Sequence, residues 1–89
     1  MATNRLEILQ QMVGQNPANA FARYGLAMEY ANAGALEKAV AEFENLIQHD
    51  ADYSAAYFHG GQALEKLGRL EDARRMYEKG IEVTIRKGD

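Results

Sequence analysis

The chain has 89 residues, a net charge of −3 and no cysteine. A chain of this length supports one small core, and its 47% hydrophobic and 26% charged residues are typical of an ordered globular domain. The lack of cysteine excludes disulfides, thiolate catalysis and cysteine-ligated zinc or iron–sulfur centres. Since no apolar run approaches about 18 residues and the N-terminus lacks the pattern of a secretory signal, we expect a cytoplasmic protein with no membrane partner.

The first predicted helix covers about residues 4–14. Asn4 and Glu7 have the spacing of a capping box, in which two side chains satisfy free backbone amides at the start of a helix. Apolar residues then follow at the spacing of one helix face: Leu6, Leu9, Met12 and Val13.

Two pairs of helices follow, because apolar residues recur there with a helical period. The predicted helices cover about residues 20–32, 36–49, 54–67 and 70–86. Gly34 and Gly68 supply the left-handed backbone conformation that ends the first helix of each pair.

The starts of the two pairs carry residues that commonly cap helices. Asn19 and Asp52 are the expected N-caps, since their side chains can accept the free amide hydrogens of the helix that follows. The hydroxyl of Ser54 is expected to add to the cap of the second pair.

The two pairs repeat each other at a fixed offset. Seven residues are identical when the sequence is shifted by 34: Ala22 and Ala56, Gly34 and Gly68, Leu36 and Leu70, Glu37 and Glu71, Ala39 and Ala73, Glu44 and Glu78, Ile47 and Ile81. The same offset places the apolar residues of the first helix opposite those of the third. The sequence therefore predicts one all-α domain over residues 1–89, with a half unit at 3–17 and repeats at 20–53 and 54–87.

This pattern resembles the tetratricopeptide repeat. The matching residues are Leu26, Ala27, Tyr30, Ala39 and Phe43 in the first repeat, and Tyr57, Gly61, Leu64, Ala73 and Tyr77 in the second. The chain departs from the pattern at Arg23, where an aromatic residue is usual, and at Gly60, where leucine is usual. The resemblance implies an α-solenoid of five helices in antiparallel hairpins with a right-handed twist, in which small residues such as Ala39 and Gly61 allow two helices to pack closely.

By the same resemblance, the first helices of the repeats line a groove that binds a peptide or helix of a partner protein. The residues expected to face it are Phe21, Tyr24, Gly25, Met28, Ala55, Phe58, His59 and Gln62. Aromatic and methionine side chains are the preferred contacts because they bury a large area and adapt to different surfaces, and the alternative is that they belong to the repeat core. Tyr24, Met28 and His59 replace residues with which one subset of the family holds a chaperone's C-terminal carboxylate, so a chaperone tail is not the expected partner.

No residue set suggests an enzyme or a cofactor site. His49 and His59 have no histidine partner at helical spacing, and Ser54 is the only serine, at a helix start. The paired glycines at 60 and 61 follow no strand, so they do not predict a phosphate-binding loop. We expect no nucleic-acid partner, because the basic residues of the tail alternate with acidic residues that can pair with them along one helix.

The last predicted helix offers an alternative function. It keeps apolar residues to its end: Tyr77, Gly80, Ile81, Val83 and Ile85. Since the end of a solenoid usually carries a polar cover, we expect either that Tyr77, Ile81 and Ile85 contact a second copy in a homo-oligomer, or that the natural chain continues beyond Asp89. Residues 66–89 hold seven basic and five acidic side chains, an excess that fits contact with an acidic copy but is most simply a solvated helix surface.

Overall fold

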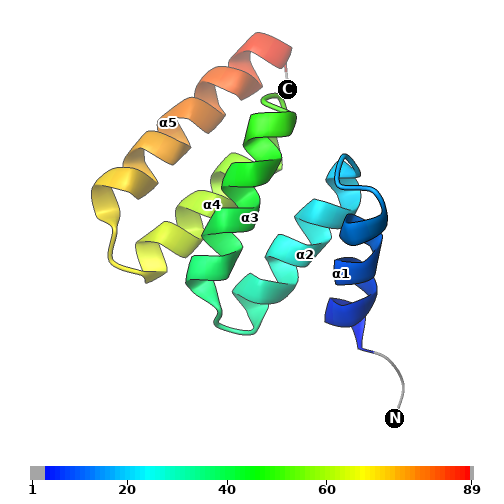
Figure 1. Cartoon of the computed structure of the whole chain (residues 1–89). Helices are drawn as coiled ribbons and strands as arrows, with labels where there is room; N and C mark the ends of the chain where they lie inside the picture. The colour runs from blue at the N-terminus through cyan, green and yellow to red at the C-terminus, as the bar shows by residue number, and fades with distance from the viewer. Residues whose placement is uncertain (1–3, 89) are drawn as a thin grey trace.

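The computed structural model describes residues 4–88, which form five helices in succession (Figure 1). The helices are α1 (Arg5–Gln15), α2 (Ala20–Asn32), α3 (Leu36–His49), α4 (Ser54–Lys66) and α5 (Leu70–Lys87). The described residues contain no strand, which confirms the predicted all-α fold, and the predicted bounds of the helices differ from these by at most one residue. Thr3, in the predicted half unit, and Asp89 lie outside the described residues.

Each helix packs against the next along the chain, and α2 also touches α4. The hairpins α2–α3 and α4–α5 turn at glycines with positive φ, 82° at Gly34 and 80° at Gly68, as the sequence predicts. None of the helices within residues 4–88 is both long and apolar enough to cross a bilayer.

The helix starts agree with the sequence at two places and differ at a third. The Asn4 Oδ1 accepts a hydrogen bond from the Glu7 amide (2.8 Å), and the Asn19 Oδ1 accepts one from the Ala22 amide (3.1 Å). The prediction that Asp52 and Ser54 cap α4 is wrong, because the N-cap residue is Tyr53 and its helix has no side-chain cap. The Asp52 carboxylate instead pairs with the guanidinium of Arg86 at 2.8 Å, near the end of α5.

The core runs along the line of helices and depends on small residues where two helices meet. Phe43 of α3 is fully buried, and the side chains packed around it come from both repeats. Ala39 is also fully buried. A Cβ atom added to Gly61 would lie 2.5 Å from the Tyr77 ring, so only glycine lets α4 and α5 approach in this way.

Candidate protein-interaction surfaces

The predicted groove residues lie on α2 and α4, at positions related by the 34-residue repeat. Phe21 is 74% exposed, the largest such fraction of any apolar side chain on α2. Gln62 is exposed as well, and the other members are half-buried: Tyr24, Gly25, Met28, Ala55, Phe58 and His59. We call this set the α2–α4 face; it consists of one largely exposed aromatic ring, the exposed Gln62 and six half-buried residues.

Tyr24 joins the two repeats through an aromatic cluster. Its ring centroid lies 6.2 Å from that of Phe43, 5.2 Å from that of Tyr53 and 5.8 Å from that of His59. His59 in turn stacks on Phe43 at 6.4 Å. Burial, followed by the neighbouring Tyr53, raises the pKa of the Tyr24 hydroxyl. Tyr24 therefore holds the repeats together whatever else it contacts.

Phe58, the counterpart of Tyr24, packs on a ring of its own repeat. It stacks on Tyr77 with ring centroids 6.5 Å apart, at the positions where Tyr24 meets Phe43 edge-to-face in the first repeat. Gly80 accommodates this ring, because a Cβ atom there would lie 3.2 Å from the tip of Phe58. Phe58 is therefore half-buried against α5, whereas Tyr24 lies between the two repeats.

The residues predicted for self-association lie at the outer side of α4 and α5. Ile81 and Ile85 are 51% and 74% exposed, and Leu70 nearby is 66% exposed. Tyr77 is half-buried. A depression of about 270 Å³ lies among them, lined by Glu65, Leu70, Ala73, Arg74, Tyr77, Glu78 and Ile81. We call this region the end face.

Two apolar residues of α5 do not belong to the end face. Gly80 is buried, and Val83 is 2% exposed, because both lie where α5 packs on α4. They therefore contribute no apolar surface to the end face. On the end face itself, burial and a hydrogen bond from the Tyr77 hydroxyl to the Glu65 carboxylate raise the pKa of Tyr77 to about 12.

Sequence reasoning missed the role of Arg23, noted only as a departure from the repeat pattern. Its side chain is buried, its Nη1 lies 2.9 Å from a carboxylate oxygen of Glu42, and its Nη2 donates to the Pro17 carbonyl at 3.1 Å. In the second repeat the hydroxyl of Tyr57 donates to the Ala51 carbonyl at 2.7 Å. Each side chain donates a hydrogen bond to the carbonyl six residues earlier, so Arg23 makes the hydrogen bond that Tyr57 makes in the second repeat.

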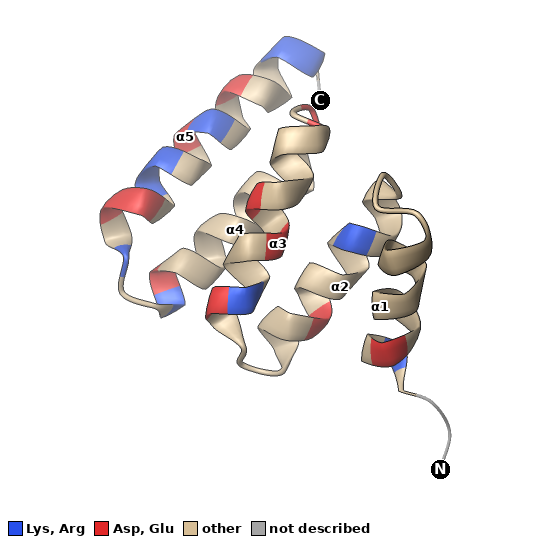
Figure 2. Cartoon of the chain, viewed as in Figure 1, with Lys and Arg blue, Asp and Glu red and all other residues tan. Residues whose placement is uncertain are grey.

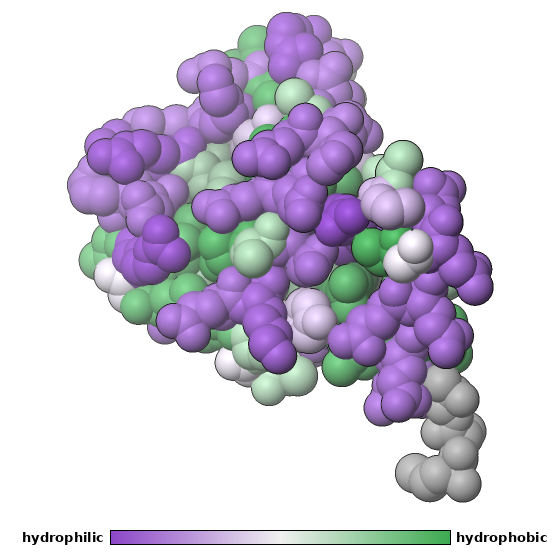
Figure 3. All heavy atoms as spheres, viewed as in Figure 1, coloured by the Kyte–Doolittle hydropathy of each residue, from purple (hydrophilic) through white to green (hydrophobic). Residues whose placement is uncertain are grey.

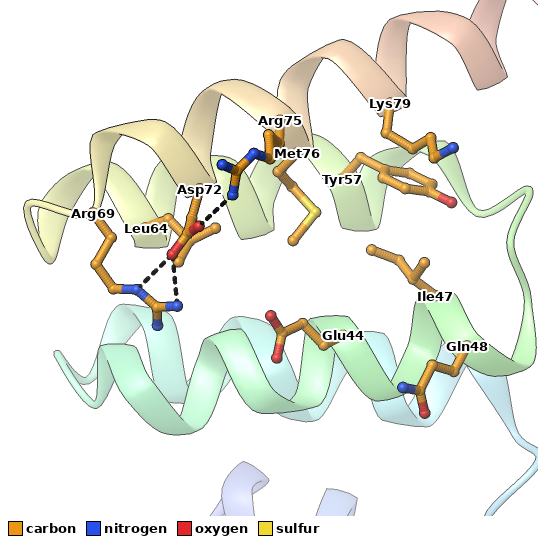
Figure 4. A pocket seen from close by; sticks show the side chains of 10 residues that line it. All are labelled: Glu44, Ile47, Gln48, Tyr57, Leu64, Arg69, Asp72, Arg75, Met76 and Lys79. Carbon is orange, nitrogen blue, oxygen red and sulfur yellow. Dashed lines mark hydrogen bonds and ion pairs between the residues drawn. The ribbon is translucent and has the colours of Figure 1, made fainter.

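A groove between α3 and α5, with α4 beneath it, was also missed. It has a volume of about 560 Å³ (Figure 4). Its lining residues are Glu44, Ile47, Gln48, Tyr57, Leu64, Arg69, Asp72, Arg75, Met76 and Lys79. Figure 4 shows Ile47 and Met76 extending into the gap from opposite helices, α3 and α5, with Tyr57 and Leu64 of α4 nearby. We call this site the α3–α5 groove.

The charged residues of the α3–α5 groove are unevenly placed. Arg69, Arg75 and Lys79 belong to the α5 side, and Glu44 stands opposite on α3 (Figure 4). Asp72 accepts bonds from Arg69 at 2.7 Å and from Arg75 at 3.2 Å. No ion pair is formed by Glu44 within the described part of the chain.

Figure 2 shows basic and acidic residues alternating along α5. Arg74 pairs along the helix, as the sequence predicts, whereas Arg86 pairs with Asp52. Arg74 lies 2.7 Å from Glu71 and 2.8 Å from Glu78. The hydrogen bond from Arg74 lowers the pKa of the Glu71 carboxyl. In the view of Figure 3, polar side chains cover most of the surface, and hydrophobic side chains are visible in the gaps between them.

Neither histidine belongs to a group that resembles a metal site. The Nδ1 of His49 lies 2.9 Å from the Asn45 carbonyl of its own helix, and His59 lies in the aromatic cluster. Across residues 4–88, no three side chains of the histidine, cysteine, aspartate or glutamate type are grouped so that they could hold an ion.

Antiparallel helix hairpins with a 34-residue period define the class of α-helical repeat proteins. The family model described as Tetratricopeptide repeat matches residues 30–84. The TPR repeat-containing protein PA0015 of Pseudomonas aeruginosa is 32% identical over 84 residues, which cover 94% of this chain and 80% of that protein. The chain therefore belongs to the tetratricopeptide repeat family, whose fold is that of a protein-interaction scaffold.

Solved structures agree with this assignment. The crystal structure of MamA superposes with a TM-score of 0.90 at 28% identity, over 93% of this chain and 48% of that one. YrrB, described as a TPR protein with an unusual peptide-binding site, superposes with a TM-score of 0.85 at 28% identity, over 88% and 40%. A tetratricopeptide repeat domain protein from Salinibacter ruber is 39% identical with a TM-score of 0.77, over 83% and 75%. The chain thus spans about half the length of MamA and less of YrrB.

Proposed function

We propose that the protein binds a peptide or helical segment of a partner protein on the α2–α4 face. The observation that carries this proposal is the 74% exposure of Phe21. Phe21 lies on α2 at helical spacing from Tyr24 and Met28, so the three share one side of the helix. An exposed phenylalanine among apolar neighbours provides an anchor, because a partner can remove its ring from water at a small cost in side-chain entropy.

The structure of the face also suggests how the binding residues divide their roles. Tyr24 and His59 support the face through the aromatic cluster, so they would fix its shape. Phe21 and Gln62 are exposed, so they would supply new contacts. The description of YrrB as having a peptide-binding site supports a peptide as the ligand, since the two proteins share their fold.

The test separates contact residues from supporting ones. Phe21→Ala removes an exposed ring and should leave the thermal melt unchanged, whereas Tyr24→Ala would also unsettle the aromatic cluster. We expect affinity capture from the native source, followed by quantitative mass spectrometry, to show a partner that Phe21→Ala loses. Ile8→Ala is the matched control, because Ile8 is a 45% exposed apolar residue on α1. Equal capture by the wild type and Phe21→Ala would refute the proposal.

The end face supports a second function, the association of two copies. Leu70 and Ile81 expose large apolar side chains at the depression there, and Ile85 exposes another farther along α5; a symmetric dimer would bury them within a charged rim. Light scattering at micromolar concentration should then give twice the monomer mass, and Ile81→Glu should return the protein to a monomer. A monomeric wild type would exclude this function.

A further inference from the structure

We propose that the α3–α5 groove is a second docking site, which takes an acidic segment of a partner protein with a bulky apolar side chain at its centre. The groove lies on the side of α3 and α5, whereas the proposed peptide site lies on α2 and α4. Its volume of about 560 Å³ falls within the range of about 300–1,000 Å³ that is common for ligand sites.

The repeat provides an internal comparison for this groove. At the equivalent positions of the first repeat, polar bonds join neighbouring helices: Arg23 of α2 to Glu42 of α3 at 2.9 Å, and Gln10 of α1 to the Tyr30 hydroxyl of α2 at 3.1 Å. In the α3–α5 groove the counterparts of Arg23, Tyr30 and Glu42 are apolar or aromatic: Tyr57, Leu64 and Met76. Tyr57 and Leu64 are themselves buried, so the apolar surface of the second groove comes from the half-buried Ile47 and Met76, whereas the first repeat has the ion pair between Arg23 and Glu42.

The charged residues also differ between the two repeats. Arg69, Arg75 and Lys79 replace three uncharged residues of the first repeat, Ala35, Ala41 and Asn45, and Asp72 replaces Lys38. With Glu44 and Asp72 included, the lining has a net charge of +1 in a chain whose net charge is −3. The basic side chains along α5, next to Ile47 and Met76, are complementary to an acidic, amphipathic segment.

The existing ion pairs leave donors for such a ligand. Asp72 uses Nε and Nη2 of Arg69 and only Nη1 of Arg75, and a guanidinium has five N–H donors. Lys79 lies 4.0 Å from Glu82, at the outer limit of an ion pair. Glu44 on the α3 side would repel a carboxylate, so the acidic residues of the ligand should lie along α5.

The test uses a phage-displayed library of short random peptides. The library is first depleted on Arg75→Ala/Lys79→Asn, which installs the residues of the first repeat, and is then selected on the wild type. We expect enriched peptides with acidic residues on both sides of an apolar one. A synthetic copy should bind the wild type at least about tenfold more tightly than the double variant, and binding should weaken with salt.

A control variant with the same change of charge keeps the test specific. Lys66→Gln/Arg74→Gln removes two basic side chains outside the groove, and we expect less than about a twofold change in affinity. Chemical-shift changes in the amide NMR spectrum should gather on the residues that line the groove. Circular dichroism melts will show whether each variant is folded.

Several results would overturn this proposal. They are a failure to enrich any peptide, enrichment of basic or uncharged peptides, and chemical-shift changes on the α2–α4 face instead of the groove. Sedimentation that shows a wild-type dimer dissociated by Arg75→Ala/Lys79→Asn would assign the groove to a second copy, which would also overturn it. None of these results depends on Phe21, so the proposed function can fail or succeed separately.

Discussion

The two hairpins α2–α3 and α4–α5 share a backbone path and a glycine turn, but they differ in how the space beside them is filled. In the first hairpin, Arg23 of α2 forms an ion pair with Glu42 of α3. The second places Tyr57 and Met76 at the same repeat positions and leaves an open groove with α3. The same fold thus accommodates either an internal ion pair or apolar and aromatic side chains at these positions.

This difference shows which features of a repeat are fixed and which can be exchanged. The hydrogen bond to the closing carbonyl is present in both repeats, donated by Arg23 in one and by Tyr57 in the other. In both repeats this position therefore serves to donate the hydrogen bond. The type of residue determines whether the rest of the side chain is charged or aromatic. Four predictions test this comparison, in order of decreasing effect.

The largest effect is expected at Phe43, which lies between the hairpins, compared with Tyr77, its counterpart on the end face. Phe43→Ala should lower the free energy of unfolding by about 3–5 kcal/mol, because a fully buried ring is lost from contact with both repeats. This is a large part of the roughly 5–13 kcal/mol expected for a domain of this size. Tyr77→Ala should cost clearly less in the same urea titration. Equal losses would mean that the end face is as well packed as the centre.

The second prediction exchanges the chemistry of the two repeats. Arg23→Ala should cost about 2–3 kcal/mol, somewhat below the usual value for a broken buried ion pair, because the Glu42 side chain remains 23% exposed. Arg23→Tyr/Glu42→Met, which copies the second repeat, should recover most of this loss, since the tyrosine hydroxyl can donate to the Pro17 carbonyl. Urea titrations of the three proteins provide the measurement. A double variant as unstable as Arg23→Ala would show that the repeats are not interchangeable here.

The third prediction concerns close packing within the second hairpin. Gly61→Leu should cost about 1–3 kcal/mol, because the new side chain would meet the Tyr77 ring. Gly14→Leu is the control, since nothing lies within 4 Å of a Cβ atom at that helical position. Thermal melts should show a lower midpoint for Gly61→Leu alone; an equal shift in both variants would point to a general effect of the substitution.

The smallest effect is the pH dependence of stability that Tyr77 causes. Its pKa of about 12 in the folded state is above the ordinary value of 10.0, so the folded protein holds this proton more tightly than the unfolded chain. The resulting stabilisation is complete below pH 10 and is lost as the pH rises toward 12. Urea titrations should therefore show a smaller decline over this range for Tyr77→Phe than for the wild type. Parallel declines would assign the effect to the other buried tyrosines.

The helices were predictable because their signals are local. Apolar residues with a helical period and glycines at the turns depend only on neighbouring positions, and so do the caps at Asn4 and Asn19. Asp52 was misassigned because its carboxylate binds Arg86, a partner 34 residues away that no local pattern indicates. The family resemblance, in turn, supplied the α2–α4 face as a candidate site.

The α3–α5 groove could not be predicted from either helix alone. Its two walls are separated in sequence by α4, and its floor comes from side chains of all three helices. A signal was nevertheless present, because the 34-residue offset places Tyr57 and Met76 opposite Arg23 and Glu42. A comparison of the residues that differ between the repeats, instead of those that match, would have indicated this site.

The arrangement in which each helix packs on its neighbours in sequence has a consequence for folding. Most contacts join residues that are close along the chain, so modest loop-closure entropy opposes their formation, and folding should be fast. Either hairpin can form first, and the burial of Phe43 then couples the two into a cooperative unit. The strength with which Phe43 couples the two hairpins therefore determines whether the protein unfolds in one step or in two.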